Sequence, residues 1–164
     1  FNISDVEETG KDFEENAILK AKNAFTKTNI SSVGDDSGLI VPAINNEPGL
    51  YSARYAGLNA TDSDNRNKLI SKLKDNKLES TYAYFFCCIV AVGIKGQNEI
   101  IVCDGKVEGE VRTIERGEKG FGYDPMFYPK GYSESFAELN SLEKNKISHR
   151  GQALKKLMDK LNKT

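Results

Sequence analysis

One long apolar run constrains this chain more than any other segment. Residues 81–94 read TYAYFFCCIVAVGI, with apolar side chains at both alternating positions. Strand side chains alternate between the two faces of a sheet, so a run this rich in aromatic and β-branched residues suits a strand covered on both sides. We expect this strand to form the middle of the sheet.

Neighbouring segments predict the rest of the sheet. A turn at residues 95–98 and a second run at residues 99–103 would complete a hairpin, and residues 106–114 read as its more polar continuation. Residues 31–44 are strand-like but are interrupted by Gly34 and Gly38, and Pro48-Gly49 marks a turn. The acidic residues between these two glycines are expected in a loop at the end of a strand.

Helical periodicity follows a possible capping box at Asp12 and Glu15, which predicts a helix from about residue 13 to residue 26. Its apolar stripe faces the core, while Asn16, Lys20 and Asn23 share another stripe.

Three further helices are expected. One has candidate N-caps at Thr61 and Ser63 and ends near Asp75-Asn76, and a short one lies near residues 136–146. The last follows Ser148, with these residues facing inward: Ala153, Leu154, Leu157, Met158 and Leu161.

Composition limits the function classes. A chain of 164 residues suits one domain, and its net charge of -1 argues against binding to a nucleic acid polymer or an anionic membrane. It shows neither a signal peptide nor a membrane-spanning run, so a cytoplasmic protein is expected. The three cysteines are odd in number, and adjacent Cys87 and Cys88 lie in the apolar run, which predicts reduced, buried thiols.

Acidic residues supply the first candidate chemistry. Consecutive Asp35 and Asp36, followed by Ser37, would suit a hard divalent cation and a base for an attacking water, although a solvated turn with an Asx cap is an equal alternative. Glu8 precedes the helix that carries Lys20. Taken alone, the glutamate reads as a helix cap and the lysine as a solvated side chain.

Two segments could bind a base or an anion. The run Gly120-Phe121-Gly122-Tyr123-Asp124-Pro125 combines flexible backbone, stacking rings and a carboxylate, or else is an aromatic turn packed on the core. His149 and Arg150 stand at the expected start of the last helix, with Lys144 just upstream. A lone histidine is more often structural, but this basic group at a helix start suits a polar ligand.

Other catalytic motifs are missing from the sequence: it has no HExxH, no Cys-x-x-Cys, no Walker A loop and no G-x-S-x-G elbow. Acidic metal ligands combined with basic and aromatic groups point to metal-assisted hydrolysis of a phosphoanhydride.

Five segments together resemble the inosine triphosphate pyrophosphatase family, the non-canonical purine NTP pyrophosphatases. They are EETGKDFEENAILKAK (7–22), GDDSGLIV (34–41), PGLYSARYAG (48–57), GFGYDPMF (120–127) and AELNSLEKNKISHRGQAL (137–154). The resemblance implies a magnesium-dependent enzyme that hydrolyses ITP, dITP and XTP to the monophosphate and pyrophosphate and so cleanses the nucleotide pool.

Residue roles follow from the same resemblance. Asp36 is expected to be the general base and a metal ligand, Glu8 a second metal ligand, and Lys20 and Ser37 contacts to the triphosphate. The remaining substrate contacts would be Phe121, Gly122, Tyr123, Asp124, Lys144, His149 and Arg150.

The implied fold is α/β: an elongated, curved, mixed sheet flanked by helices, with two lobes around a nucleotide cleft, usually as a homodimer. Residues 1–164 would form one such domain without the family's N-terminal strand and phosphate-binding loop, and slow or no turnover is expected of such a chain. The alternatives are a catalytically impaired remnant or nucleotide-binding module, and a purely structural domain, which leaves the polar motifs unexplained.

Overall fold

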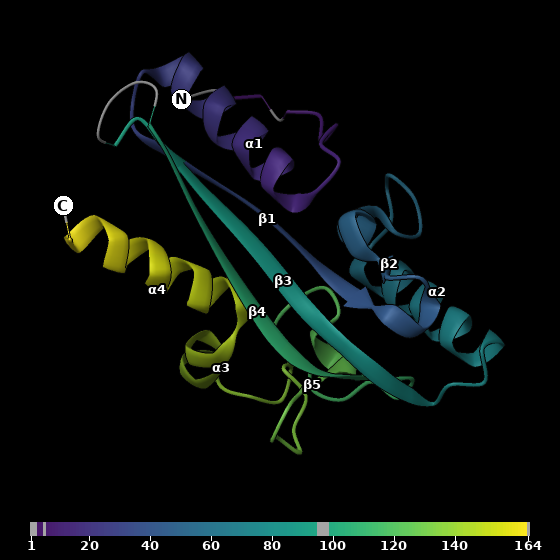
Figure 1. Ribbon diagram of the computed structural model, residues 1–164. Coiled ribbons are helices and arrows are strands. Elements are labelled where there is room, and N and C mark those ends of the chain that lie inside the picture. Colours follow the sequence, from purple (N-terminus) through teal and green to yellow (C-terminus); the bar gives the residue numbers. More distant parts are fainter. Residues whose placement is uncertain (1–2, 5, 95–98, 164) are drawn as a thin grey trace. The chain divides into compact units, whose positions relative to one another are not determined.

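The computed structural model describes residues 3–4, 6–94 and 99–163. Five strands form one sheet in the order β2-β1-β3-β4-β5, and four α-helices accompany them in the described residues (Figure 1). The strands are β1 (Ser32–Val41), β2 (Glu47–Pro48), β3 (Ser80–Val92), β4 (Ile100–Arg112) and β5 (Phe127–Pro129). The helices are α1 (Phe13–Thr28), α2 (Asp62–Asp75), α3 (Ser141–Ile147) and α4 (His149–Asn162), with short 3₁₀ turns at Pro42–Ile44, Gly49–Arg54 and Asp124–Met126.

The predicted α/β class, a sheet flanked by helices, is confirmed, and the apolar run is its middle strand, β3. The second run of the expected hairpin and its more polar continuation form one strand, β4, which ends at Arg112. The sheet is antiparallel rather than mixed: β1 pairs with β2 and β4 with β5 in antiparallel register. The turn predicted at residues 95–98 lies outside the described residues.

The chain divides into two compact units. Unit 1 comprises Phe1–Ser37, Cys87–Gly105 and His149–Thr164, and unit 2 comprises Gly38–Phe86 and Lys106–Ser148. Strands β1, β3 and β4 each contribute one part to unit 1 and the other part to unit 2. The two units are described one at a time below.

In unit 1, helix α1 packs tightly on β1 at Gly34. A Cβ atom added to Gly34 would lie 2.6 Å from the carbonyl oxygen of Ala17 and 2.6 Å from the amide nitrogen of Ala21, so only glycine permits this approach. The helix begins at the predicted N-cap, where the Asp12 side chain accepts a hydrogen bond from the Glu15 amide. The Glu15 carboxylate accepts from the Lys11 amide rather than closing the expected capping box.

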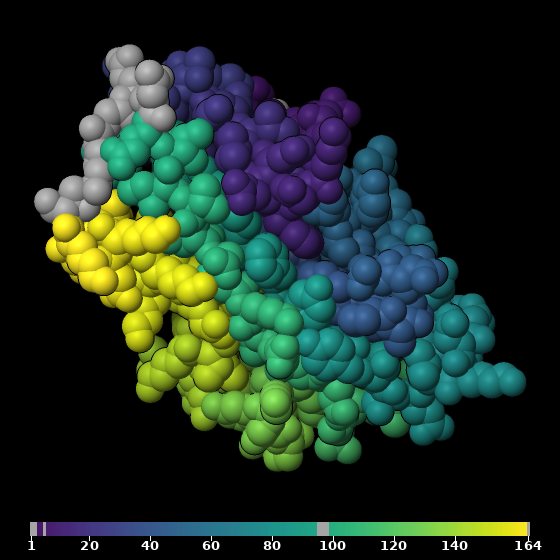
Figure 2. Space-filling model, in the orientation of Figure 1, coloured from purple at the N-terminus to yellow at the C-terminus, as the bar shows by residue number. Residues whose placement is uncertain are grey.

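Helix α4 also belongs to unit 1 and packs on β3 and β4. Ala153 and Leu157 are buried in a cluster with Cys87, Ile89, Ala91, Ile101 and Cys103. Leu161 is partly buried against this cluster, but the expectation for Leu154 and Met158 was wrong, because they are 45% and 55% exposed. Figure 2 shows α4, in yellow, at the molecular surface. All three cysteines are free and buried, as expected.

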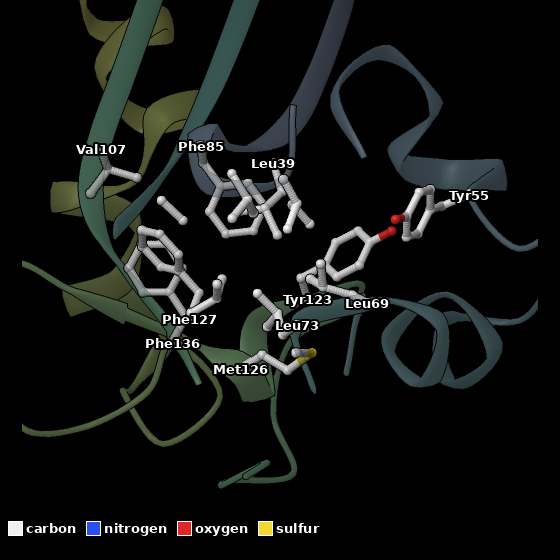
Figure 3. Close-up of a cluster of buried hydrophobic side chains, with 14 of the residues drawn as sticks. Leu39, Tyr55, Leu69, Leu73, Phe85, Val107, Tyr123, Met126, Phe127 and Phe136 are labelled. Carbon is white, nitrogen blue, oxygen red and sulfur yellow. The ribbon is translucent and has the colours of Figure 1, made fainter. Parts of the chain in front are cut away.

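Unit 2 holds the larger apolar cluster (Figure 3). Its centre is aromatic: the ring of Phe127 lies 4.7 Å from Phe85 and 5.0 Å from Phe136, measured between centroids. Helix α2 adds Leu69 and Leu73, both completely buried.

The start of α2 carries a complete capping box. The Asp64 amide donates to Thr61 Oγ1, and the Thr61 amide donates to the Asp64 carboxylate, so Thr61 is the N-cap of the two candidates. In the described part of the chain, no helix is both long enough and apolar enough to cross a membrane.

Candidate functional site

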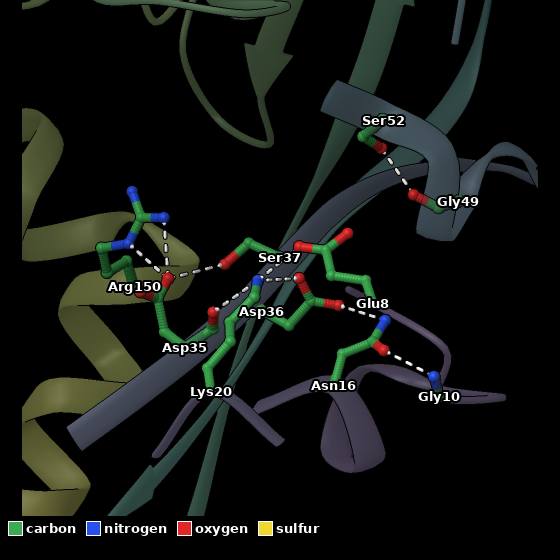
Figure 4. A network of polar contacts seen from close by, with 10 residues as sticks. All are labelled: Glu8, Gly10, Asn16, Lys20, Asp35, Asp36, Ser37, Gly49, Ser52 and Arg150. Atoms are coloured by element: carbon green, nitrogen blue, oxygen red, sulfur yellow. Dashed lines mark hydrogen bonds and ion pairs between the residues drawn. The ribbon is translucent and has the colours of Figure 1, made fainter. Parts of the chain in front are cut away.

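The Asp35-Asp36-Ser37 motif lies within strand β1, not in the loop at its end that the sequence suggested. Because neighbouring residues of a strand point to opposite faces, the two aspartates do not form one pair of metal ligands. Asp36 faces α1, where it contacts Lys20, and Asp35 contacts Arg150 of α4 (Figure 4). The adjacent carboxylates therefore belong to two different polar networks.

Asp36, Lys20 and Glu8 form the first network, which we call the acid–lysine cluster. Lys20 Nζ lies 2.8 Å from Asp36 Oδ1 and 2.6 Å from Glu8 Oε1, and it also donates to the main-chain carbonyl of Asp35. Asp36 is 7% exposed, and its other oxygen, Oδ2, accepts a hydrogen bond of 3.1 Å from Asn16 Nδ2. Asn16 is itself buried and accepts from the Gly10 amide, which ties the segment before α1 to the cluster.

Burial and the neighbouring charged groups shift the pKa values of Asp36 and Lys20 in opposite directions. Burial is the largest influence on Asp36 and raises the pKa of its carboxyl group, although the hydrogen bonds from Lys20 and Asn16 oppose it. Burial lowers the pKa of Lys20, but the hydrogen bonds and charges of Asp36 and Glu8 outweigh it and raise that pKa above 10.5. Lys20 is therefore a cation at neutral pH, and Asp36 is a stronger base than an exposed aspartate.

Glu8 and Asp36 fit a divalent cation by their donor chemistry. Both carboxylates converge on a single cationic atom, Lys20 Nζ, and Mg²⁺ in nucleotide enzymes commonly takes one or two carboxylates together with phosphate oxygens. The described residues contain no group of three or more His, Cys, Asp or Glu side chains that could hold a metal.

Asp35 organises the second network of unit 1. Its Oδ2 atom accepts from Arg150 Nε at 3.1 Å and Nη2 at 2.8 Å, and Ser37 Oγ lies 3.5 Å from the same oxygen. His149 precedes Arg150 and is 8% exposed. The start of α4 fits closely against β4, because a Cβ on Gly105 would lie 1.9 Å from the His149 carbonyl oxygen. Gly34 thus lets α1 approach β1, and Gly105 lets the start of α4 approach β4, which brings the side chains of the two networks into position.

In unit 2, residues 120–125 form a tight turn that we call the aromatic turn. Asp124 is 3% exposed, and its Oδ2 accepts from the Phe121 amide at 2.8 Å and lies 2.5 Å from Lys144 Nζ. A Cβ on Gly120 would lie 2.1 Å from that oxygen, so the turn requires glycine there. Asp124 therefore shapes the turn from inside.

The two rings of the aromatic turn have different surroundings. Phe121 is 61% exposed, and Lys144 Nζ lies 4.8 Å from its ring centroid. Tyr123 is 3% exposed, and its hydroxyl donates to the Ser52 carbonyl oxygen at 2.9 Å. We expected both rings to offer stacking faces, but in this structure only Phe121 does, and Tyr123 anchors the turn to the core.

Two polar residues of the networks were not predicted as site residues. Asp35 was considered only as part of a carboxylate pair, and Asn16 only as a member of the polar stripe of α1. The stripe placed Asn16 and Lys20 on one face of the helix, but only the structure shows that Asn16 is buried there.

The family model described as "Ham1 family" matches residues 1–160. The chain belongs to the Ham1 family. A relative from Bacillus anthracis named dITP/XTP pyrophosphatase is 46% identical over 160 residues, which cover 98% of this chain and 79% of the relative. Another from Idiomarina loihiensis with the same name is also 46% identical, over 99% of this chain and 81% of its own.

Solved Ham1 structures agree with the fold. A HAM1 protein from Coxiella burnetii matches with a TM-score of 0.92 and 42% identity, covering 99% of this chain and 82% of that one. The Staphylococcus aureus Ham1 protein matches with a TM-score of 0.87 and 45% identity, covering 97% and 81%.

Proposed function

We propose that this chain hydrolyses non-canonical purine nucleoside triphosphates such as ITP, dITP and XTP to the monophosphate and pyrophosphate. The observation that carries the proposal is the buried carboxyl group of Asp36, held between Lys20 and Asn16 in a chain 46% identical to proteins named dITP/XTP pyrophosphatase. Its role would be to remove these nucleotides from the nucleotide pool.

Asp36 acts as the general base. A water molecule attacks the α-phosphorus, its proton passes to the Asp36 carboxylate, and the bond to the bridging oxygen breaks as pyrophosphate leaves. Burial raises the pKa of Asp36 and so increases its basicity, which favours proton transfer from water. Asn16 and Lys20 each hold one carboxylate oxygen and fix the orientation of the group.

Glu8 and Asp36 would hold Mg²⁺, which when bound neutralises charge on the phosphate oxygens. Lys20 supplies a further positive charge for the triphosphate, since two carboxylates keep it protonated. Ser37 follows Asp36 in β1, but its hydroxyl lies 3.5 Å from Asp35 Oδ2 in the second network, and from there it is a further proposed contact to the phosphates. This division of roles suits phosphoryl chemistry, in which positioning and charge stabilisation supply most of the catalysis.

The aromatic turn and the start of α4 each carry groups that suit a purine base. Phe121 offers the exposed ring for stacking, while Gly122, Tyr123, Asp124 and Lys144 set its position. His149 and Arg150 carry donors suited to the 6-oxo group that distinguishes inosine and xanthosine from adenosine. By family resemblance, the enzyme is further proposed to be a cytoplasmic homodimer.

Replacing Asp36 with Asn tests the catalytic assignment. The change keeps the shape of the side chain but removes its basicity, so kcat for ITP in the natural protein should fall by about 10²-fold or more. Pyrophosphate release is the measurement. Asp35→Asn is the matched control, because it makes the same change on the opposite face of β1, and its effect on kcat should be smaller. Equal effects of the two variants would contradict the assignment of Asp36 as base.

Metal dependence is a separate prediction. Chelation with EDTA should abolish ITP hydrolysis, and added Mg²⁺ should restore it. Glu8→Gln removes one proposed ligand charge and should raise the Mg²⁺ concentration required for half-maximal activity. Full activity in EDTA would contradict the metal requirement. An unchanged Mg²⁺ requirement in Glu8→Gln would show that Glu8 is not a metal ligand.

A further inference from the structure

Helix α2 holds Gly122 of the aromatic turn from both sides. The Gly122 amide donates to Asp62 Oδ2 at 2.7 Å, and the Gly122 carbonyl oxygen accepts from Arg66 Nη1 at 2.9 Å. Asp62 and Arg66 are four residues apart, so they share one face of the helix. Both peptide groups of this glycine are thus fixed by charged side chains from a segment far away in the sequence.

Gly122 is a position where such support matters. Its φ is +59°, a left-handed conformation that glycine adopts readily, and a Cβ there would meet nothing within 4 Å. Local crowding therefore does not restrain the glycine, and Gly120, two residues earlier, also has a positive φ of +79°. Without restraints from outside, a turn of this composition samples many conformations.

The helix that supplies the restraints is itself firmly seated in unit 2. Asn65 is 2% exposed, its side-chain oxygen accepts from the Ala56 amide at 2.7 Å, and its Nδ2 donates to the Ala53 carbonyl oxygen at 3.1 Å. Arg66 is further held by Glu115, whose Oε2 lies 3.0 Å from Arg66 Nε. The position of Gly122 is consequently set by a rigid element and not by the turn alone.

We infer that Asp62 and Arg66 are positioning residues that preorganise the aromatic turn and so set the affinity for the nucleotide base. The inference rests on the proposed function. Asp62 fixes the peptide that follows Phe121, the ring proposed to stack on the base, while Arg66 fixes the next peptide. Neither residue is required to touch the substrate.

The kinetic test uses Arg66→Ala and Asp62→Ala in the natural protein. Each variant should raise KM for ITP by about tenfold while kcat changes by less than about twofold, because ordering the turn affects binding rather than the chemical step. The conservative variants Arg66→Lys and Asp62→Asn keep a donor and an acceptor, respectively, and should recover most of the affinity.

Asp64→Ala is the matched control. Asp64 lies in the same helical turn and completes the capping box with Thr61, so its loss weakens the start of α2 without removing a contact to Gly122. It should lower Tm and leave KM unchanged. If KM rises equally in Asp64→Ala and Arg66→Ala, or stays at the wild-type value in Arg66→Ala and Asp62→Ala, the positioning role is wrong.

A second measurement does not depend on turnover. The Gly122 amide should exchange with solvent slowly in the nucleotide-free wild type and faster in Asp62→Ala, with little change in Asp64→Ala. Equal exchange rates in wild type and Asp62→Ala would overturn the restraint itself. Failure of the wild type to hydrolyse ITP, together with slow exchange, would instead refute the proposed function and leave the restraint established.

Discussion

At the residue scale, burial and hydrogen bonding have opposite effects on the pKa of the Asp36 carboxyl group. Burial raises its pKa, whereas the hydrogen bonds from Lys20 and Asn16 lower it, and burial has the larger effect. A base must be deprotonated to act, so the proposed activity should be lost as the pH falls through a pKa that lies above 3.8. The neighbours of Asp36 therefore control where the acidic limb of the pH profile lies.

Asn16→Ala tests this control. Removing the donor to Asp36 Oδ2 removes an influence that lowers the pKa, so the acidic limb of kcat/KM for ITP should move to higher pH. Asn23→Ala is the control, because Asn23 lies on the same stripe of α1 but donates to the Ser4 carbonyl oxygen. An acidic limb at the same pH in wild type and Asn16→Ala would contradict the explanation.

The sequence predicted the types of residue in the site better than their grouping. Glu8, Lys20 and Asp36 were all identified, and the structure brings them together on one ammonium group. The pairing of Asp35 with Asp36 was wrong, because two residues adjacent in sequence lie on opposite faces once the segment is a strand. We had expected the motif in a loop, where consecutive side chains need not point to opposite faces.

At the element scale, the approach of α1 to β1 depends on Gly34. A methyl group there would meet main-chain atoms of Ala17 and Ala21, which cannot move aside without shifting the helix. Gly34→Ala should therefore lower the free energy of unfolding by about 1–3 kcal/mol, as overpacking does in other cores.

Denaturant unfolding of Gly34→Ala measures this loss. Val33→Ala is the comparison, because Val33 is the preceding residue and is 53% exposed, so its replacement should cost less than about 1 kcal/mol. Equal stability of Gly34→Ala and the wild type would show that the helix accommodates the extra methyl group.

Element identity was largely predictable, and side-chain exposure on one helix was not. The period of the apolar residues correctly predicted β3, α1, α2 and α4, since these patterns are long and regular. Leu154 and Met158 fit the same helical pattern as Leu157, yet both are more than 40% exposed. Periodicity defines a stripe, but the width of the stripe that becomes covered depends on the partner surface, which the local sequence does not describe.

At the scale of the whole molecule, three strands link the two compact units. Strands β1, β3 and β4 each begin in one unit and end in the other. Unfolding the part of a strand in one unit therefore disturbs the part of the same strand in the other unit. We predict a single cooperative unfolding transition, with the same midpoint for amides in α1 of unit 1 and in α2 of unit 2.

Hydrogen exchange across a denaturant series measures these midpoints separately. Gly34→Ala, which is in unit 1, should lower the midpoint of the α2 amides as much as that of the α1 amides. Two transitions, or a shift confined to α1, would show that the units unfold independently.

Because Asp35 and Asp36 are consecutive in β1, charge pairing alone does not distinguish the correct alignment of this strand from one shifted by a residue. If β1 slipped by one residue toward either end, an aspartate could still meet a cation, because Asp35 and Asp36 carry the same group. The same slip would bring the side chain of Val33 or Asp35 to the place of Gly34, against the main chain of α1. Gly34, which has no side chain, thus permits one alignment of β1 and disfavours the alignments shifted by one residue.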